Sequence, residues 1–156
     1  MRHQPGFTLV ELMVTIALLA FLLMIAAPYT SAWANNARLL EGQRILEEGI
    51  GRAKALALRN PNGRTVEDST PAALLCLDSS TRTLSLYAPS GTSCTGTARW
   101  TARLPNGFAA KVGTQNLASL PFDNRGLLVA AGASPSMSSP WTLSLSVGQE
   151  TADVRL

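Results

Sequence analysis

The sequence predicts an α+β protein in which one long N-terminal helix precedes a domain of antiparallel β-sheets. Two observations support this fold class. The chain opens with a long apolar run that passes into an amphipathic stretch, as expected of a continuous helix. After Gly63 the pattern changes to short apolar runs separated by Gly, Asn, Ser and Pro, which is typical of strands and turns.

The apolar run extends from Phe7 to Ala27 and contains one charged residue, Glu11. As a helix it would span about 31 Å, close to the hydrocarbon thickness of a bilayer. Residues 1–6 are polar and basic with no acid, which predicts that this end stays in the cytoplasm. The sequence therefore predicts a transmembrane helix over residues 7–34.

Glu11 is a feature that a simple membrane anchor does not need. A charged side chain at the centre of a membrane helix costs about 2.5–3.5 kcal/mol on insertion scales, so an intramembrane acid indicates a functional site. The alternative is that Glu11 lies at the level of the lipid headgroups and stays hydrated.

Two further features bear on the predicted anchor. Pro28 is expected to kink the helix or loosen one turn, because proline lacks an N–H donor. Ala32-Trp33-Ala34 satisfies a small-x-small cleavage signal, so a secretory peptide removed after Ala34 is an alternative interpretation. The length of the apolar run and the presence of Glu11 favour the anchor.

Residues 35–62 are predicted to continue the same helix in amphipathic form. Charged side chains occupy most positions outside one apolar stripe, and Asn60-Pro61-Asn62-Gly63 should end the helix. The stripe, which we expect to pack on a folded domain, consists of Leu39, Leu46, Ile50, Ala53 and Ala57, with Gln43 in its one gap.

Residues 63–156 are predicted to form a β-rich domain. Its most regular strand is residues 141–147, where apolar and hydroxylated residues alternate as in a half-buried antiparallel strand. Turns are expected at residues 79–82, 105–107 and 124–126, each joining the two strands of a hairpin. The expected strands are residues 72–78, 83–88, 99–104, 108–112, 120–123, 127–131, 141–147 and 151–156.

The chain has two cysteines, Cys76 and Cys94, both beyond the membrane segment. If the N-terminus is cytoplasmic, both face an oxidising compartment, where such a pair normally forms a disulfide. The bridge would close a loop of about 19 residues and stabilise the fold by roughly 3 kcal/mol in the chain-entropy model.

Composition and motifs argue against an enzyme. His3 is the one histidine, so neither a Ser-His-Asp triad nor a zinc cluster can be built, and we expect no catalytic residue, metal or cofactor. No phosphate-binding or dinucleotide glycine pattern is present. Four scattered acids fit turn positions better than an acid/base pair: Asp78, Asp123, Glu150 and Asp153.

Gly6-Phe7-Thr8-Leu9-Val10-Glu11, joined to the charge-free helix, resembles the class III leader of type IV prepilins and type II secretion pseudopilins. The resemblance implies that a prepilin peptidase removes residues 1–6 by cutting after Gly6 and N-methylates Phe7. It implies that Glu11 pairs with the amino terminus of a neighbouring subunit during assembly. The implied location is a single pass through the inner membrane with the C-terminal domain in the periplasm. The implied partners are lipid, an inner-membrane assembly platform and other pilins or pseudopilins.

Two later stretches are similar to patterns of the GspH/FimT group. Residues 51–60 form an Ala/Arg-rich run ending in Arg-Asn, with Gly51 and Lys54 where Ala and Ser or Glu are common. Residues 121–126 contain the Phe-Asp-x-x-Gly pattern of a hairpin. This similarity implies a minor pilin that primes assembly of a type IV pilus at or near its tip or, alternatively, pseudopilin H of a type II secretion system.

DNA binding is a weaker alternative, because some FimT-type pilins take part in DNA uptake. The candidate contacts are Arg99, Trp100, Arg103 and Lys111, since cations beside an aromatic ring can hold phosphates and stack a base. Strand alternation favours a different arrangement, with Trp100 in the core and both arginines solvated. The formal charge of +3 is too small to imply nucleic acid by itself.

Overall fold

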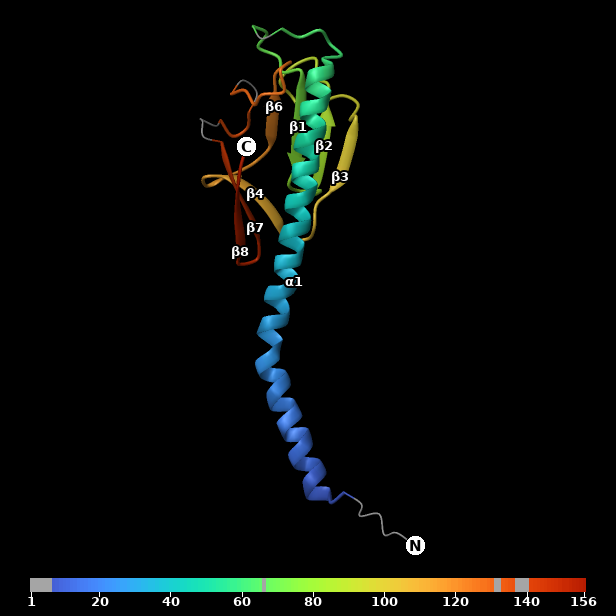
Figure 1. Ribbon diagram of the computed structural model, residues 1–156, viewed down its shortest axis with the longest axis vertical. Helices are drawn as coiled ribbons and strands as arrows, with labels where there is room; N and C mark the ends of the chain where they lie inside the picture. The colour runs from blue at the N-terminus through green and yellow to red at the C-terminus, as the bar shows by residue number, and fades with distance from the viewer. Residues whose placement is uncertain (1–6, 66, 131–132, 137–140) are drawn as a thin grey trace. The chain divides into compact units, whose positions relative to one another are not determined.

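The computed structural model describes residues 7–65, 67–130, 133–136 and 141–156, apart from the side chains of residues 27 and 28. It confirms the α+β class: within these residues one long helix precedes eight strands (Figure 1). The chain divides into two units, residues 1–34 and 35–156. The elements are α1 (Leu9–Arg59), β1 (Ala73–Asp78), β2 (Thr83–Tyr87), β3 (Trp100–Arg103), β4 (Phe108–Val112), β5 (Gln115–Asn116), β6 (Ser119–Phe122), β7 (Thr142–Val147) and β8 (Glu150–Arg155).

The first unit contains the apolar half of α1. Within the described residues α1 is the one helix long and apolar enough to cross a membrane. Helical structure continues through position 28, so the proline is accommodated without ending the helix. Position 34, where the alternative cleavage signal ends, also lies inside α1. The expected effect of Pro28 on its own turn stays a prediction.

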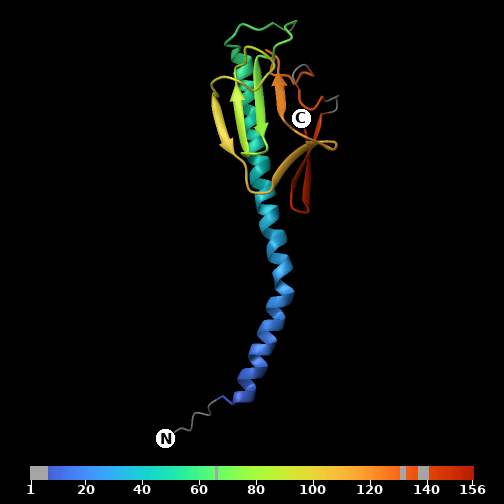
Figure 2. The same ribbon diagram turned by 180° about the vertical axis from the view of Figure 1, so that it is seen from behind.

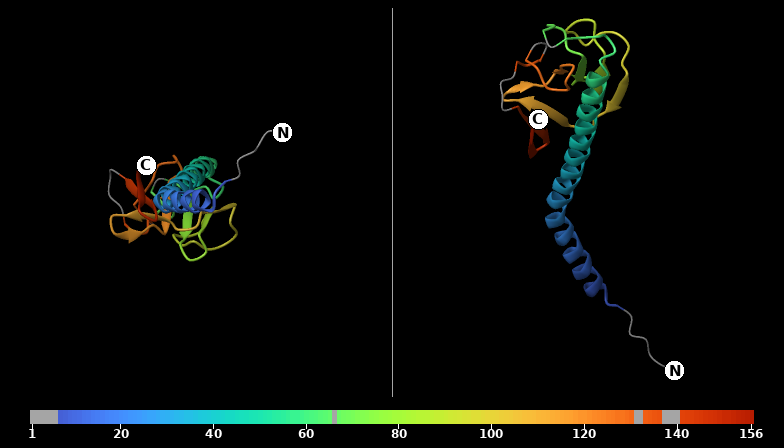
Figure 3. Two further views of the ribbon diagram at one scale, coloured as in Figure 1. Left: turned by 90° about the horizontal axis from the view of Figure 1, so that it is seen from below. Right: turned by 45° about the horizontal axis from the view of Figure 1, so that its top comes forward.

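In the second unit, the last turns of α1 lie against one face of a four-stranded sheet with the order β3-β2-β1-β6 (Figures 1 and 2). A second sheet has the order β5-β4-β7-β8, and all strand pairs in both sheets are antiparallel. Figure 3 shows the same two groups of strands from two further directions. The core joins all three parts, with Leu46 from α1, Leu75 and Leu84 from the first sheet, and Phe108 and Leu145 from the second.

The buried stripe of α1 corrects one expected position. Gly42, rather than Gln43, fills the gap between Leu39 and Leu46. Gln43 is half-buried, and its Nε2 donates a hydrogen bond to Glu47 at 2.8 Å. Position 42 follows Leu39 by three residues and precedes Leu46 by four, so it lies on the same helix face. A glycine adds no apolar side chain to a periodic pattern, so periodicity alone could not identify position 42 as buried.

Glycine is required there because the backbone of α1 approaches the second sheet closely. A Cβ atom on Gly42 would overlap the ring of Phe108. About two helical turns further along α1, a Cβ on Gly49 would lie 2.7 Å from Cδ2 of Leu84 in the first sheet. These two glycines let one helix pack against both sheets.

The strand pattern differs from the prediction in three places. The turn at residues 105–107 joins β3 of the first sheet to β4 of the second, so it connects the two sheets. Residues 127–130 form no strand and contribute an isolated bridge between Leu128 and Phe122. The short strand β5 was not expected, because Gln115 and Asn116 are polar and exposed.

The last hairpin confirms its prediction. Leu143, Leu145 and Val147 of β7 are buried, and the residues between them are not. Strand β8 returns along β7 over its whole length, with Val147 opposite Glu150. The short turn between them needs the left-handed conformation of Gly148, whose φ is 62°.

A disulfide joins β1 to the segment between β2 and β3. Cys76 and Cys94 are bonded, and their Cα atoms lie 6.0 Å apart. Neighbouring residues of a strand point to opposite faces, and Leu75 belongs to the core shared with α1. Cys76 therefore holds this segment on the face of the first sheet that points away from α1.

Candidate functional site

The N-terminal site lies where α1 begins. Phe7 precedes the helix, and its side chain is 83% exposed. Gly6, the residue expected to precede the cut, lies outside the described residues. The expected new amino terminus is therefore two positions before Leu9, the first helical residue.

Thr8 caps the start of the helix, a role that the sequence analysis missed. Its carbonyl accepts the N–H of Leu12 at 3.1 Å, and its Oγ1 accepts the N–H of Glu11 at 3.2 Å. A Thr followed three residues later by Glu has the spacing of a capping box, in which the acid can reach back to the N–H of the capping residue. Thr8 and Glu11 thus form one unit at the positive end of the helix dipole.

Glu11 is exposed in the first turn of α1. Neither of the two ion pairs found among the described residues involves Glu11, since they join Arg52 to Glu48 and Arg125 to Asp123. Its carboxylate is therefore accessible to a cation supplied by another chain.

The rest of the first unit presents an apolar surface. Every large apolar side chain from Leu9 to Ile25 is more than half exposed. Such a continuous surface marks a segment that contacts a membrane or other proteins. The apolar helix fits a membrane anchor by its length, its composition and this exposure.

The structure does not bring the four candidate DNA contacts to one place. Arg99 and Trp100 lie at the start of β3 on the edge of the first sheet, whereas Lys111 lies on β4 of the second sheet. Arg103, at the end of β3, lines a different hollow with Arg82.

Trp100 is half-buried and packs against the core, as strand alternation predicted. Arg99 donates its N–H to the carbonyl of Leu86 at 2.7 Å, although Leu86 is paired in register with Trp100. Arg99 and Trp100 thus both lie opposite Leu86, which is the arrangement of a β-bulge. The guanidinium carbon of Arg52 lies 5.3 Å from the centroid of the Trp100 ring, within the range of a cation–π interaction.

The scattered acids mainly organise turns. Asp78 accepts hydrogen bonds from the hydroxyl and the N–H of Ser80, at 2.6 and 2.8 Å, and from the N–H of Thr81. The hydrogen bond from the Ser80 hydroxyl, with those from Thr81 and the backbone, lowers the pKa of Asp78 to about 2. Glu150 and Asp153 lie instead on β8.

Asp123 organises the turn after β6. Burial alone would raise the pKa of Asp123, but hydrogen bonds from the N–H of Leu127 and from the side chain and N–H of Arg125 outweigh it and lower this pKa. Arg125 also forms an ion pair with Asp123 at 2.8 Å. Gly126, with φ of 75°, brings the turn close to Leu58 of α1. The Phe-Asp-x-x-Gly pattern therefore has a structural role.

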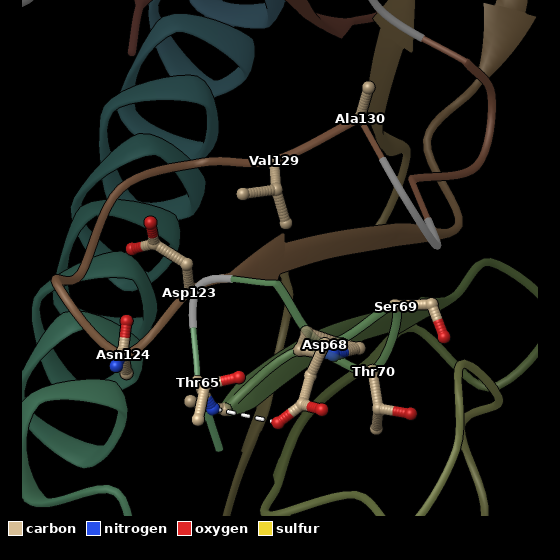
Figure 4. A pocket seen from close by; sticks show the side chains of 10 residues that line it. Thr65, Asp68, Ser69, Thr70, Asp123, Asn124, Val129 and Ala130 are labelled. Atoms are coloured by element: carbon tan, nitrogen blue, oxygen red, sulfur yellow. Dashed lines mark hydrogen bonds between the residues drawn. The ribbon is translucent and has the colours of Figure 1, made fainter.

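A hollow of about 230 Å³ lies beside this turn (Figure 4). Both polar and apolar residues line it, and Asp68 and Asp123 are among them. Asp68 accepts the N–H of Thr65 at 2.7 Å, so both carboxylates are engaged in local structure. Among the residues that the structure describes, no group of three or more His, Cys, Asp or Glu could hold a metal ion.

Comparison with known families finds a match in the N-terminal region. The model of the prokaryotic N-terminal methylation motif matches residues 1–27. Comparison with curated proteins and with solved structures gave no match. The chain thus carries a prepilin-type N-terminal methylation motif, which implies processing by a prepilin peptidase and assembly with other pilin-type subunits.

Proposed function

We propose that this chain is a minor pilin-like structural subunit of a type IV pilus that primes assembly at or near the filament tip. The observation that carries the proposal is the methylation motif over residues 1–27, placed on a helix whose apolar side chains are exposed. The chain would be anchored in the inner membrane by residues 7–34, with its β-rich domain in the periplasm. It would act by polymerisation and catalyse no reaction.

In the proposed mechanism a prepilin peptidase cuts after Gly6 and methylates Phe7. The carboxylate of Glu11 then pairs with the amino terminus of a neighbouring subunit. Opposite charges attract strongly in a low-dielectric environment, and leaving one of them unpaired there is costly. The pair would therefore favour assembly and fix the register between subunits, while the exposed apolar helices form the core of the filament.

Two structural features support the GspH/FimT assignment. Asn60, which ends the Arg-Asn run, adopts a φ of 44° and donates its N–H to the carbonyls of Leu56 and Ala57, so it caps the C-terminus of α1. Its side chain exchanges two hydrogen bonds of 2.7 Å with the backbone of Arg64. Asp123 and Gly126 build the turn described above. Both patterns therefore have structural roles, and they fit pseudopilin H of a type II secretion system, the alternative, equally well.

A DNA-binding tip pilin is the weakest alternative. Of its four candidate residues, only Arg99 and Trp100 line the same groove. Lys111 is on the other sheet, and Arg103 faces a hollow that Glu41 also lines.

A chromosomal deletion tests the system that the chain serves. Loss of surface pili or twitching with normal export of secreted enzymes would support the pilus assignment. Loss of secretion with normal pili would support pseudopilin H and contradict the first proposal. Normal pili and normal secretion would contradict both.

Variants at the helix start separate charge pairing from helix capping. Gly6→Val is expected to block processing. Glu11→Ala should be processed but should enter filaments about tenfold less, because the pairing charge is lost. The measurements are the mass of the mature chain and its amount in sheared filaments.

Two matched controls sharpen this test. Glu11→Gln can still complete a capping box but carries no charge, whereas Thr8→Ala removes the cap and keeps the charge. Charge pairing predicts poor assembly of Glu11→Gln and near-normal assembly of Thr8→Ala. The opposite result would show that Glu11 acts through the helix cap, and normal incorporation of Glu11→Ala would refute the pairing mechanism.

A further inference from the structure

A groove of about 200 Å³ lies between the end of α1 and the edge strand β3. We call it the basic groove, because three of the side chains that line it are arginines. It is lined by Arg52, Ala55, Leu56, Arg59, Leu86, Arg99 and Trp100.

Two of the three arginines carry unneutralised charge. Arg52 is held by Glu48, with donor–acceptor distances of 2.8 and 2.9 Å, and it lies over the Trp100 ring. Arg59 and Arg99 are exposed, and within the described part of the chain their side chains have neither a hydrogen-bond partner nor an ion-pair partner. The basic groove therefore presents two free guanidinium groups, one from α1 and one from the residue that precedes β3.

Between these charges the groove is apolar. Leu56 and Trp100 are half-buried and Leu86 is buried, and all three belong to or pack against the core. Guanidinium groups bind carboxylates through paired hydrogen bonds, while the apolar side chains favour an apolar group beside the acid. The volume suits one or two side chains.

Nucleic acid fits this groove less well than an acidic peptide. Binding along a phosphate backbone uses several cations in a row, and here only Arg59 and Arg99 are free. One face of the Trp100 ring is already covered by Arg52, which limits stacking of a base.

We propose that the basic groove receives an acidic segment, flanked by apolar residues, on the domain of a different pilin-type subunit next to this one in the filament. This inference rests on the proposed function. A second copy of this chain is a poorer occupant, because the chain is basic, with a formal net charge of +3, and five of its ten acids already accept hydrogen bonds or form ion pairs. These engaged acids are Glu47, Glu48, Asp68, Asp78 and Asp123.

Site-specific photocrosslinking in cells of the host tests the proposal. A benzophenone amino acid replaces Ala55, which is exposed and lines the groove, and in a control chain it replaces Thr151, which is exposed on β8. The expected result is an adduct, specific to position 55, with another chain that carries an N-terminal methylation motif. Peptide mapping should place the cross-link in a segment that contains Asp or Glu.

Charge reversal supplies the second arm of the test. Arg59→Glu combined with Arg99→Glu should lower the adduct about tenfold, since two favourable charge pairs become unfavourable. Arg155→Glu, an exposed arginine on β8, is the matched control and should leave the adduct unchanged. Reversing the mapped acid of the partner to Arg should restore the adduct. Near-ultraviolet circular dichroism of the purified full chain checks that the double variant folds.

Four results would overturn the inference: no adduct, an adduct with nucleic acid, an adduct with lipid, or an adduct between two copies of this chain. If the chain enters filaments and any of these results is found, the proposed function stands and the groove assignment fails. If the processed chain never enters filaments, the proposed function fails and the groove assignment fails with it.

Discussion

The two halves of α1 differ in the exposure of their apolar side chains. From Leu9 to Ile25 every large apolar side chain is more than half exposed, and the one charge in this stretch is Glu11. From residue 39 to residue 57 one stripe is buried against two sheets, and charged side chains occupy much of the rest. A continuous helix can therefore serve two environments, and each half has to be interpreted by what its side chains contact.

The glycines of α1 also differ in their surroundings. Gly42 and Gly49 are buried and leave no room for a Cβ, so the second half needs them for close packing. Gly51 is exposed, and a Cβ there would have no heavy atom within 4 Å. The same residue type is thus required at two positions of the helix and unnecessary for packing at a third.

The largest expected effect comes from truncating the buried stripe. Leu46, which is 0% exposed, belongs to the core that α1 shares with both sheets, and Leu46→Ala should lower the free energy of unfolding by about 2–5 kcal/mol. Leu19, which is 59% exposed, is the matched control in the first half, and Leu19→Ala should change the free energy of unfolding by less than about 0.5 kcal/mol. Urea unfolding of the full chain in detergent micelles measures both, and equal losses would remove the distinction between the halves.

A smaller effect is expected where the helix approaches the second sheet. Helix propensity alone would make Gly42→Ala stabilising by about 1 kcal/mol. The Cβ would overlap the Phe108 ring, so we expect a net loss of about 1–3 kcal/mol. The same urea unfolding measures it.

A second substitution identifies the cause of that loss. Phe108→Leu in the Gly42→Ala chain should recover part of the stability, and the double-mutant cycle gives the coupling between the two positions. A stability gain in the single variant would mean that the ring moves aside without cost.

Much of the fold follows from short-range patterns in the sequence. The pairs β1–β2 and β7–β8 are hairpins, in which alternation and a short turn determine the register. The division of the strands between two sheets could not be predicted. It depends on the pairing of β1 with β6 and of β4 with β7, which are far apart in the sequence.

The two candidate sites also differ in whether adjacent residues or long-range packing form them. The N-terminal motif is local, so Phe7 and Glu11 could be identified from adjacent residues, although the cap formed by Thr8 was missed. The basic groove combines Arg52 and Arg59 of α1 with Arg99 next to β3, and no local pattern joins a helix to a distant strand. Long-range packing had to be known before these charges could be seen as one surface.

Acid pH is expected to weaken the second unit through its turn carboxylates. The folded-state pKa of Asp78 is about 2, below its ordinary value of 3.8. A lowered pKa means that this group stabilises the fold above about pH 4 and that its contribution is lost as the pH falls toward 2. Asp123, whose pKa is also lowered, acts in the same direction.

Urea midpoints between pH 5 and pH 2 measure this effect. Asp78→Asn should flatten the pH dependence, because asparagine does not titrate. An unchanged slope in Asp78→Asn would show that the hydrogen bonds of Asp78 do not contribute to the pH dependence. Substituting Ser80, the main donor to Asp78, should weaken the slope in the same way.

The smallest expected effect tests the exposed glycine of α1. Gly51→Ala should raise the free energy of unfolding by about 0.5–1 kcal/mol, because alanine loses less backbone entropy in a helix and the site is open. Together with the loss expected for Gly42→Ala, this gain would show that the same substitution changes sign across one helix according to what packs on it. A loss at Gly51 would contradict its open surroundings in the isolated chain. Reduced filament incorporation of a more stable Gly51→Ala chain would indicate that a neighbouring subunit approaches the helix at this position.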